Sequence, residues 1–364
     1  MLSSVVCYII LLLFMIGFSW YGSHAKHHKY FGAVSASLAF AVFFGIRYMV
    51  GTDFYTYYIN YEDLKLGYQT DEFLRWEIGF RAIFIYFARL GCHYSLPFGV
   101  IAFLQCFLIY IALRKQYKVW TFIPFTLILT CIWISYANIM RHMLAFSIFI
   151  VSIRFLADKQ YLKYCLCIAL AFLFHNSAIL LYLLIFPYMI KNEYFSNIKL
   201  QFILLGIALV LMNINMVQNI FELFSTAISF MNYDDYLTSH YAEFNEDIRF
   251  GMGPLSMLII AIFLIAYSNK MKDYYASSTV SIMYDLYFIG IFIHFAFIRM
   301  FLLQRLNYYF YSFEFIIGAL TLGYLYKSHR LRTFIILATM FLMLFLGKLL
   351  LSQDIGSYRT FFSA

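Results

Sequence analysis

Long apolar stretches, separated by short groups of Lys and Arg, run along the whole of this sequence. They cover residues 2–20, 30–46, 96–113, 119–136, 140–156, 162–174, 177–190, 198–212, 254–268, 280–297, 306–326 and 333–351. A helix needs about 20 residues to cross roughly 30 Å of hydrocarbon, and shorter spans occur within a bundle. We therefore predict an all-α fold, a polytopic transmembrane bundle of about 11–13 membrane helices with surface or re-entrant helices on its outer face.

The composition excludes a soluble enzyme. Hydrophobic residues make up 64% of the chain and charged residues 12%, whereas about a quarter of the residues in a soluble domain are charged. No internal repeat or linker divides the chain, so we expect one membrane domain over residues 1–364. Residues 2–18 lack a basic start and a small-residue cleavage site, and we expect a retained membrane helix rather than a signal peptide.

The basic residues predict the orientation of the bundle. They form islands that we expect to be cytoplasmic, at Lys26/Lys29, Arg114/Lys115/Lys118, Lys159/Lys163, Lys191/Lys199, Lys270/Lys272 and Lys327/Arg330/Arg332. Both termini then lie outside. This solution requires that residues 79–92 do not cross the membrane fully and that residues 162–190 form two short helices meeting outside at His175. Because the net charge of +8 is spread over islands and not over one face, we expect no nucleic-acid partner.

A long loop over residues 213–253 is expected on the outer face. It begins with apolar residues at helical spacing, which predicts an amphipathic helix on the membrane surface or against the bundle. Its later part is acidic and contains tyrosines that could stack on sugars, although anchoring at lipid headgroups is the favoured explanation.

Cationic side chains gather at the predicted outer ends of the helices. They are Arg47, Arg141, His142, His175, Arg299 and Arg305. A single arginine at a helix end often reaches for lipid headgroups, and the segment from Gly51 to Asp53 reads equally well as a turn with a helix cap. Several such residues at one level instead predict a site for a lipid-linked diphosphate, because the guanidinium fork matches phosphate oxygens and stays charged.

His175 lies between two apolar stretches and is a candidate general base. An unperturbed imidazole titrates near neutrality, so it can take a proton from a hydroxyl group. A ring that is simply hydrogen-bonded inside the bundle is the alternative, and Asp53 or Glu77 could do the same work. The six cysteines lack metal-ligand spacing and no Asp-x-Asp pair occurs, so we expect no metal and no other cofactor.

Four ordered motifs resemble the EpsG family of Wzy-like polysaccharide polymerases. They are Arg47-Tyr-x-Val-Gly-Thr-Asp53-Phe-x-x-Tyr57, Trp76-Glu77-x-Gly79-Phe80, Arg141-x-x-Leu-Ala-x-Ser147 with Leu173-Phe-His175-Asn-Ser-Ala178, and Gln304-Arg305-Leu-x-Tyr-Tyr-Phe310. The resemblance extends over about residues 1–345. One departure is His142, where the family pattern has Gln, and this puts the local contacts of position 142 in question.

The resemblance implies an activity and its partners. Such proteins polymerise undecaprenyl-diphosphate-linked oligosaccharide repeats on the outer, periplasmic face of the bacterial cytoplasmic membrane, moving the growing chain onto a new lipid-linked repeat. The implied partners are these lipid-linked oligosaccharides, membrane lipids, a chain-length regulator and a flippase.

For this reaction we hypothesise roles from the chemistry of the side chains. Arginines stabilise the departing negative charge, so we assign the two diphosphates to Arg47, Arg141, Arg299 and Arg305. We assign the base to His175 or Asp53, and sugar contacts or support to Tyr57, Glu77 and His142.

Two other functions stay open at this point. An O-antigen ligase uses the same kind of donor with a different acceptor, and the sequence barely separates it from a polymerase. A lipid-linked glycan transporter or flippase should show inverted repeats and Gly/Pro-broken helices near the bilayer midplane, and the sequence shows neither.

Overall fold

The computed structural model describes residues 2–25, 28–212, 251–351 and 358–363, and these ranges contain helices, turns and one isolated β-bridge but no strands. The predicted all-α bundle is confirmed. The predicted amphipathic helix falls on residues 213–250, outside the described residues. The α-helices are α1 (Leu2–His24), α2 (Lys29–Gly45), α3 (Phe54–Lys65), α4 (Asp71–Leu74), α5 (Ile78–Arg89), α6 (Ser95–Ala112), α7 (Phe122–Leu129), α8 (Ile132–Asn138), α9 (Met140–Ala157), α10 (Tyr161–Phe172), α11 (Ile185–Ile190), α12 (Ile198–Leu211), α15 (Met252–Tyr275), α16 (Ser278–Ala296), α17 (Phe301–Tyr311), α18 (Phe313–Lys327) and α19 (Leu331–Leu351). The described residues also form the 3-10 helices η1 (Arg114–Val119), η2 (Asn176–Leu184) and η4 (Phe361–Ser363).

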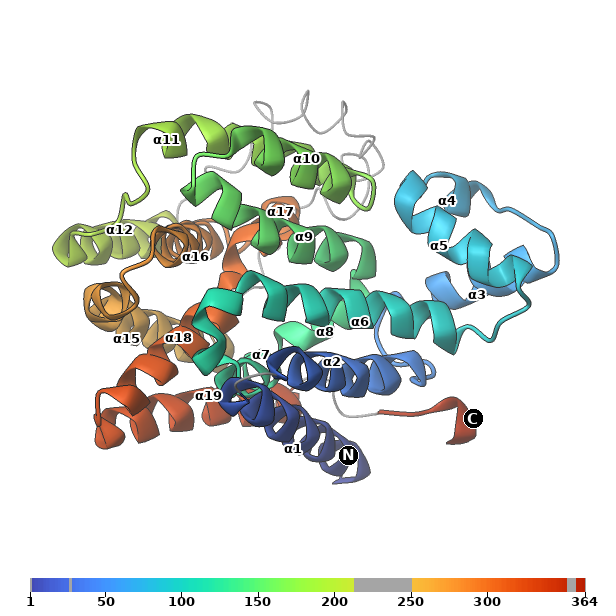
Figure 1. Cartoon of the computed structure of the whole chain (residues 1–364), viewed down its shortest axis with the longest axis horizontal. Helices are drawn as coiled ribbons and strands as arrows, with labels where there is room; N and C mark the ends of the chain where they lie inside the picture. Colours follow the sequence, from blue (N-terminus) through green and yellow to red (C-terminus); the bar gives the residue numbers. More distant parts are fainter. Residues whose placement is uncertain (1, 26–27, 213–250, 352–357, 364) are drawn as a thin grey trace.

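Among the described residues, six helices are long and apolar enough to cross a bilayer, and four apolar helices are shorter. The long ones lie in α1, α6, α9, α15, α16 and α19. In α9 and α16, 78% of the apolar window is buried, against 28% in α1 and α19, so α9 and α16 lie inside the bundle. Helices α1 and α19 form a rim along the lower edge of Figure 1. Rim residues such as Leu13, Phe14 and Ile336 are more than half exposed, as lipid-facing side chains are. The number of membrane crossings stays a prediction.

Breaks interrupt several of the apolar stretches, and the stretch 306–326, for example, divides at Ser312 between α17 and α18. The stretch 162–190 divides at His175, whose extended backbone separates α10 from η2, as predicted. The stretch 119–136 was expected to form one helix, but it breaks between α7 and α8, where Cys131 adopts a left-handed conformation with φ of 61°. The break leaves the Thr130 carbonyl without its helical partner, and Lys348 of α19 donates to it at 3.0 Å.

Helices α3, α4 and α5 stand beside the main bundle (Figure 1). They share an aromatic core in which Tyr57, Trp76 and Phe84 are buried. Helix α5 has 12 residues. At 1.5 Å per residue it is about 18 Å long, well short of the roughly 30 Å of hydrocarbon. This length agrees with the prediction that residues 79–92 do not cross the membrane fully.

Loops that carry predicted cytoplasmic islands meet at one end of the bundle. The Lys29 ammonium lies 5.4 Å from the ring centre of Tyr117, within the island at residues 114–118. In the same island Gln116 donates to Ser277 at 3.4 Å, a few residues after Lys272. These three loops therefore lie close together, which agrees with their placement on one side of the membrane.

Residues near the two ends of the chain meet in the region that contains Arg47. The amide of Tyr358 donates to the Ser4 hydroxyl at 2.9 Å. Arg47 and Thr360 form an antiparallel β-bridge, with the Tyr48 amide donating to the Arg359 carbonyl at 2.9 Å. This pairing agrees with the prediction that both termini lie on the same side as Arg47.

Candidate functional site

Glu77 lies at the centre of a polar cluster where α5 approaches the break at His175. It occupies the N-cap position of α5. Two residues later the Gly79 amide donates to the Leu173 carbonyl at 2.8 Å. A Cβ at Gly79 would lie 2.7 Å from that carbonyl oxygen, so only glycine allows this approach. The close contact places the Glu77 carboxylate against the start of η2.

Three donors from two other segments bind the Glu77 carboxylate. Arg141 Nη1, in the first turn of α9, donates to Oε2 at 2.7 Å. His175 Nδ1 lies 2.9 Å from Oε1, and the Asn176 backbone amide donates to the same oxygen at 3.1 Å. The Glu77 side chain is only 4% exposed, whereas Arg141 is 27% and His175 12% exposed. The acid is therefore internal support, and its two partners form the accessible surface.

His142 connects this cluster to α17. Its ring stacks on Tyr309 with centres 4.1 Å apart and lies 4.8 Å from the His175 ring. The ring of Tyr308 meets it edge-on at 6.0 Å. His142 is 5% exposed, so it supports His175 from behind in this conformation.

Asp53 and Arg305 add opposite charges to the cluster, and the neutral phenol of Tyr57 borders it. Arg305 acts electrostatically on Asp53 and on His175, which places α17 and the start of α3 close to the same centre. Tyr57 is buried beside Trp76 and couples to Arg141 and Asp53. Asp53 and Arg305 are half-buried, whereas Tyr57 is covered.

The protonation states follow from these contacts. Burial by itself would raise the pKa of the Glu77 carboxyl, but the His175 hydrogen bond and the Arg141 charge lower it to about 2. Burial lowers the pKa of the His175 imidazole, the contact with Glu77 offsets only part of that shift, and the arginines add to it. Near neutral pH, Glu77 is therefore a carboxylate and His175 a neutral imidazole.

Arg47 is buried between helices. Its side chain is 1% exposed and donates to the carbonyls of Phe44 at 3.1 Å and Ala137 at 2.7 Å. Burial lowers the pKa of its guanidinium to about 10, so the group stays charged near neutral pH. The following turn is held by Gly51, whose φ is 97° and where a Cβ would lie 2.0 Å from the Asn138 side chain. The prediction that Arg47 binds a diphosphate stays a prediction, and in this conformation the residue ties α2 to α8.

The structure thus joins most of the predicted site residues. Segments that are far apart in the sequence supply Asp53, Tyr57, Glu77, Arg141, His142, His175 and Arg305. Arg299 lies half-buried in the turn before α17, and its predicted phosphate contact stays a prediction. Sequence reasoning did not foresee the backbone amide of Asn176 or the stacking of Tyr309 on His142. The adjacent aromatic residues after Arg305 were the only signal for the latter.

Comparison with models of known protein families identifies the family of this chain. The EpsG family model matches residues 29–361, which include every residue of the cluster. The chain belongs to the EpsG family. Membership in this family supports a polysaccharide polymerase-like role with glycosyltransferase-like chemistry. No curated protein and no solved structure matches the chain.

Proposed function

We propose that this EpsG-family protein extends a polysaccharide by transferring the growing chain from one polyprenyl diphosphate onto a second lipid-linked repeat unit. The observation that carries the proposal is the joining of Arg141, His175 and Glu77 into one hydrogen-bonded unit. It combines a fixed cation for a diphosphate with an oriented, neutral imidazole. These are the two groups that displacement of a diphosphate by a sugar hydroxyl requires.

His175 serves as the general base on this proposal. A neutral imidazole that donates its Nδ1 proton to Glu77 carries its lone pair on Nε2. There it accepts the proton of the acceptor hydroxyl as that oxygen attacks the anomeric carbon, a contribution of about 10²–10⁴-fold in rate. Asp53 is the alternative base. The Asp53 carboxylate interacts with the charge of Arg305 and accepts a hydrogen bond from Thr52 at 3.3 Å. His175 is held by a shorter hydrogen bond to Glu77, so we favour His175 over Asp53 as the base.

Arg141 and Arg305 stabilise the departing diphosphate. The bond between the anomeric carbon and the diphosphate oxygen breaks, its electron pair leaves with that oxygen, and the acceptor oxygen forms the new glycosidic bond. The added negative charge on the lipid diphosphate needs donors that are already in place. Glu77 holds the Arg141 fork, which therefore need not be ordered when substrate binds.

The remaining residues act as support. We propose that His142 and Tyr57 position His175 and Arg141 from the buried side, and that Arg47 holds the helices behind them. Glu77 fixes the tautomer of His175. Direct contacts with sugars fall to Asp53 and Arg305, which are half-buried.

We place this site on the outer face of the bacterial cytoplasmic membrane. The neighbouring basic loops that contain Lys29, Gln116 and Ser277 support this assignment. Helices α9 and α10 meet at the predicted cytoplasmic island Lys159/Lys163, and Arg141 and His175 lie at or just past the opposite ends of these two helices. With the basic end inside, the cluster faces outward, where lipid-linked repeats are assembled into polysaccharide.

The test is extension of purified lipid-linked repeat units by the purified protein, read as a ladder of glycan lengths. We expect a ladder with the native protein, with or without a chelator, and none with Arg141→Ala or His175→Ala. Exposed Arg89 on the nearby α5 provides the matched control, and Arg89→Ala should give a normal ladder. Failure of the folded native protein to extend its own repeat units would refute the proposal. Transfer of the glycan to a different acceptor would instead indicate a ligase.

A further inference from the structure

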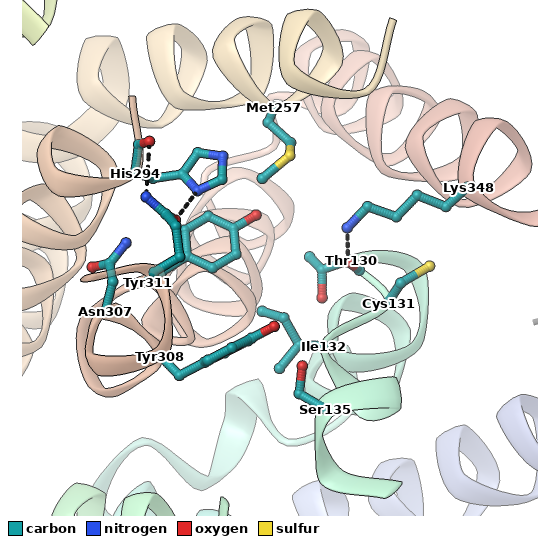
Figure 2. A pocket seen from close by; sticks show the side chains of 11 residues that line it. Thr130, Cys131, Ile132, Ser135, Met257, His294, Asn307, Tyr308, Tyr311 and Lys348 are labelled. Carbon is teal, nitrogen blue, oxygen red and sulfur yellow. Dashed lines mark hydrogen bonds between the residues drawn. The ribbon is translucent and has the colours of Figure 1, made fainter. Parts of the chain in front are cut away.

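A second polar site lies on the other side of α17 from His142. A cavity of about 210 Å³ opens beside the break between α7 and α8 and is bordered by α15, α16, α17 and α19. Figure 2 shows the side chains of Lys348, Tyr308 and Tyr311 around it. Irregular backbone at membrane depth is tolerated where it is buried or lines a polar cavity. The break at Cys131 therefore has a structural purpose that a continuous helix would not serve.

Lys348 is the cation of this cavity. It lies in α19, inside an apolar window long enough to cross the membrane. Its ammonium donates to the Thr130 carbonyl at 3.0 Å, and among the described residues no carboxylate lies within ion-pair distance. Glu314 accepts from the Tyr311 hydroxyl at 2.7 Å and acts on Lys348 only at longer range, through its charge. An ionisable residue inside a membrane helix commonly marks a ligand or ion site.

Neutral polar groups accompany this cation. Hydroxyl groups of Ser135 and Tyr308 line the cavity. Gln304 donates its amide N–H groups to backbone carbonyls, and its amide oxygen accepts from His294 Nδ1 at 2.8 Å. In that tautomer the Nε2 of His294 is an acceptor, so this ring adds no donor for an anion. The donors at the cavity are the Lys348 ammonium and the two hydroxyl groups, and a cation with hydroxyl donors suits a phosphate group better than an apolar ligand.

The size of the cavity limits what fits. At about 210 Å³ it is smaller than the roughly 300–1,000 Å³ of most small-molecule sites, so it suits a head group and not an oligosaccharide. Tyr308 forms part of its lining and also meets the His142 ring edge-on at 6.0 Å. A group in the cavity would therefore lie one aromatic side chain away from the cluster around Glu77.

We propose that the Lys348 cavity binds the phosphate of a membrane lipid head group. Two lipids carry this chemistry: a polyprenyl diphosphate, which as a second substrate rests on the proposed function, and an anionic phospholipid. Lys348 pairs with the phosphate oxygens, and the hydroxyl groups of Tyr308 and Ser135 donate to them. The reaction needs two lipid diphosphates, and this cavity would hold one beside the other.

Binding to the purified protein in detergent tests the proposal, with undecaprenyl diphosphate and phosphatidylglycerol as separate probes. Lys348→Met should weaken binding of at least one probe about tenfold or more, since hydrogen bonds to charged groups are the strong ones. Lys348→Arg should retain most of the affinity, and Tyr308→Phe should lose part of it. Lys270→Met, at an exposed position on α15, is the matched control and should bind both probes normally.

The outcomes separate the two lipids. Weaker binding of undecaprenyl diphosphate alone assigns the cavity to the substrate, and weaker binding of phosphatidylglycerol alone assigns it to the surrounding bilayer. Unchanged binding of both probes to a monodisperse Lys348→Met protein overturns the proposal. Because the readout is binding, it stands even if the protein extends no glycan.

Discussion

His175 Nδ1 and Glu77 Oε1 lie 2.9 Å apart although 98 residues separate them in the sequence. The carboxylate selects the imidazole tautomer and also holds Arg141 at 2.7 Å. A single buried acid therefore sets the geometry of the proposed base and of the proposed phosphate ligand. Changes at Glu77 should affect both.

Glu77→Gln should lower the rate of glycan extension by about 10²–10⁴-fold, the contribution of an oriented general base. The amide leaves Arg141 without its counter-charge, and its NH2 group places a donor opposite either Arg141 or His175 Nδ1. Rates measured on purified lipid-linked repeats check this. Glu62→Gln, in an exposed pair with Lys65 on α3, is the control and should change little. A Glu77→Gln enzyme as fast as its parent would contradict the role of the acid.

The rate of extension should fall in acid with a midpoint below about 6.5, the ordinary pKa of histidine. Burial lowers the pKa of His175, so the imidazole stays neutral, and active as a base, down to that lower pH. Glu77 stays ionised throughout because its pKa is about 2. Asp53→Asn should keep the same acid limb. Loss of that limb in Asp53→Asn, together with most of the activity, would identify Asp53 as the base instead.

Arg141→Lys should reduce extension by about 10²–10³-fold, comparable with the loss of one preorganised donor to a developing charge. Lysine keeps the charge, but it cannot place one N–H on Glu77 and another on phosphate in the same plane. Arg89→Lys is the control. Equal rates for the two variants would show that position 141 needs only charge.

Gly79→Ala should destabilise the protein by about 1–3 kcal/mol, the usual cost of overpacking, and should also slow extension. The new Cβ would meet the Leu173 carbonyl at 2.7 Å and push α5 away from the break at His175. Gly206→Ala in α12 is the matched control, since no atom lies within 4 Å of its Cβ position. Thermal unfolding of both variants, followed by rate measurements, decides the matter. A Gly79→Ala protein with parental stability would show that the contact can relax.

Most of the helices could be predicted because lipid leaves the backbone little choice but to pair within each apolar stretch. The break at Cys131 could not be predicted, because it depends on a hydrogen bond from Lys348, which lies 218 positions after Thr130 in the sequence. Lys348 itself gave no signal, because one lysine near the end of an apolar stretch is typical of headgroup contact.

The site residues were predicted as a group, but their individual roles depend on tertiary packing. An arginine at a helix end reads the same whether it reaches lipid, phosphate or protein carbonyls. The structure turns Arg47 toward the carbonyl of Ala137 and leaves Arg141 partly exposed. Glu77 was expected to support the site or hold sugars, and it proves to organise the cluster.

The bridge between Arg47 and Thr360 has a consequence for biosynthesis. Helices α1 and α2 enter the membrane early, but the backbone partner of residues 46–48 emerges only after more than 300 further residues have been made. Tyr358 also stacks on Phe43, with ring centres 4.1 Å apart. The pairing of residues 46–48 with the segment around Thr360 is therefore among the last parts of the fold to form. A nascent chain released before residue 358 would lack this partner and would expose residues 46–48 to quality-control proteases.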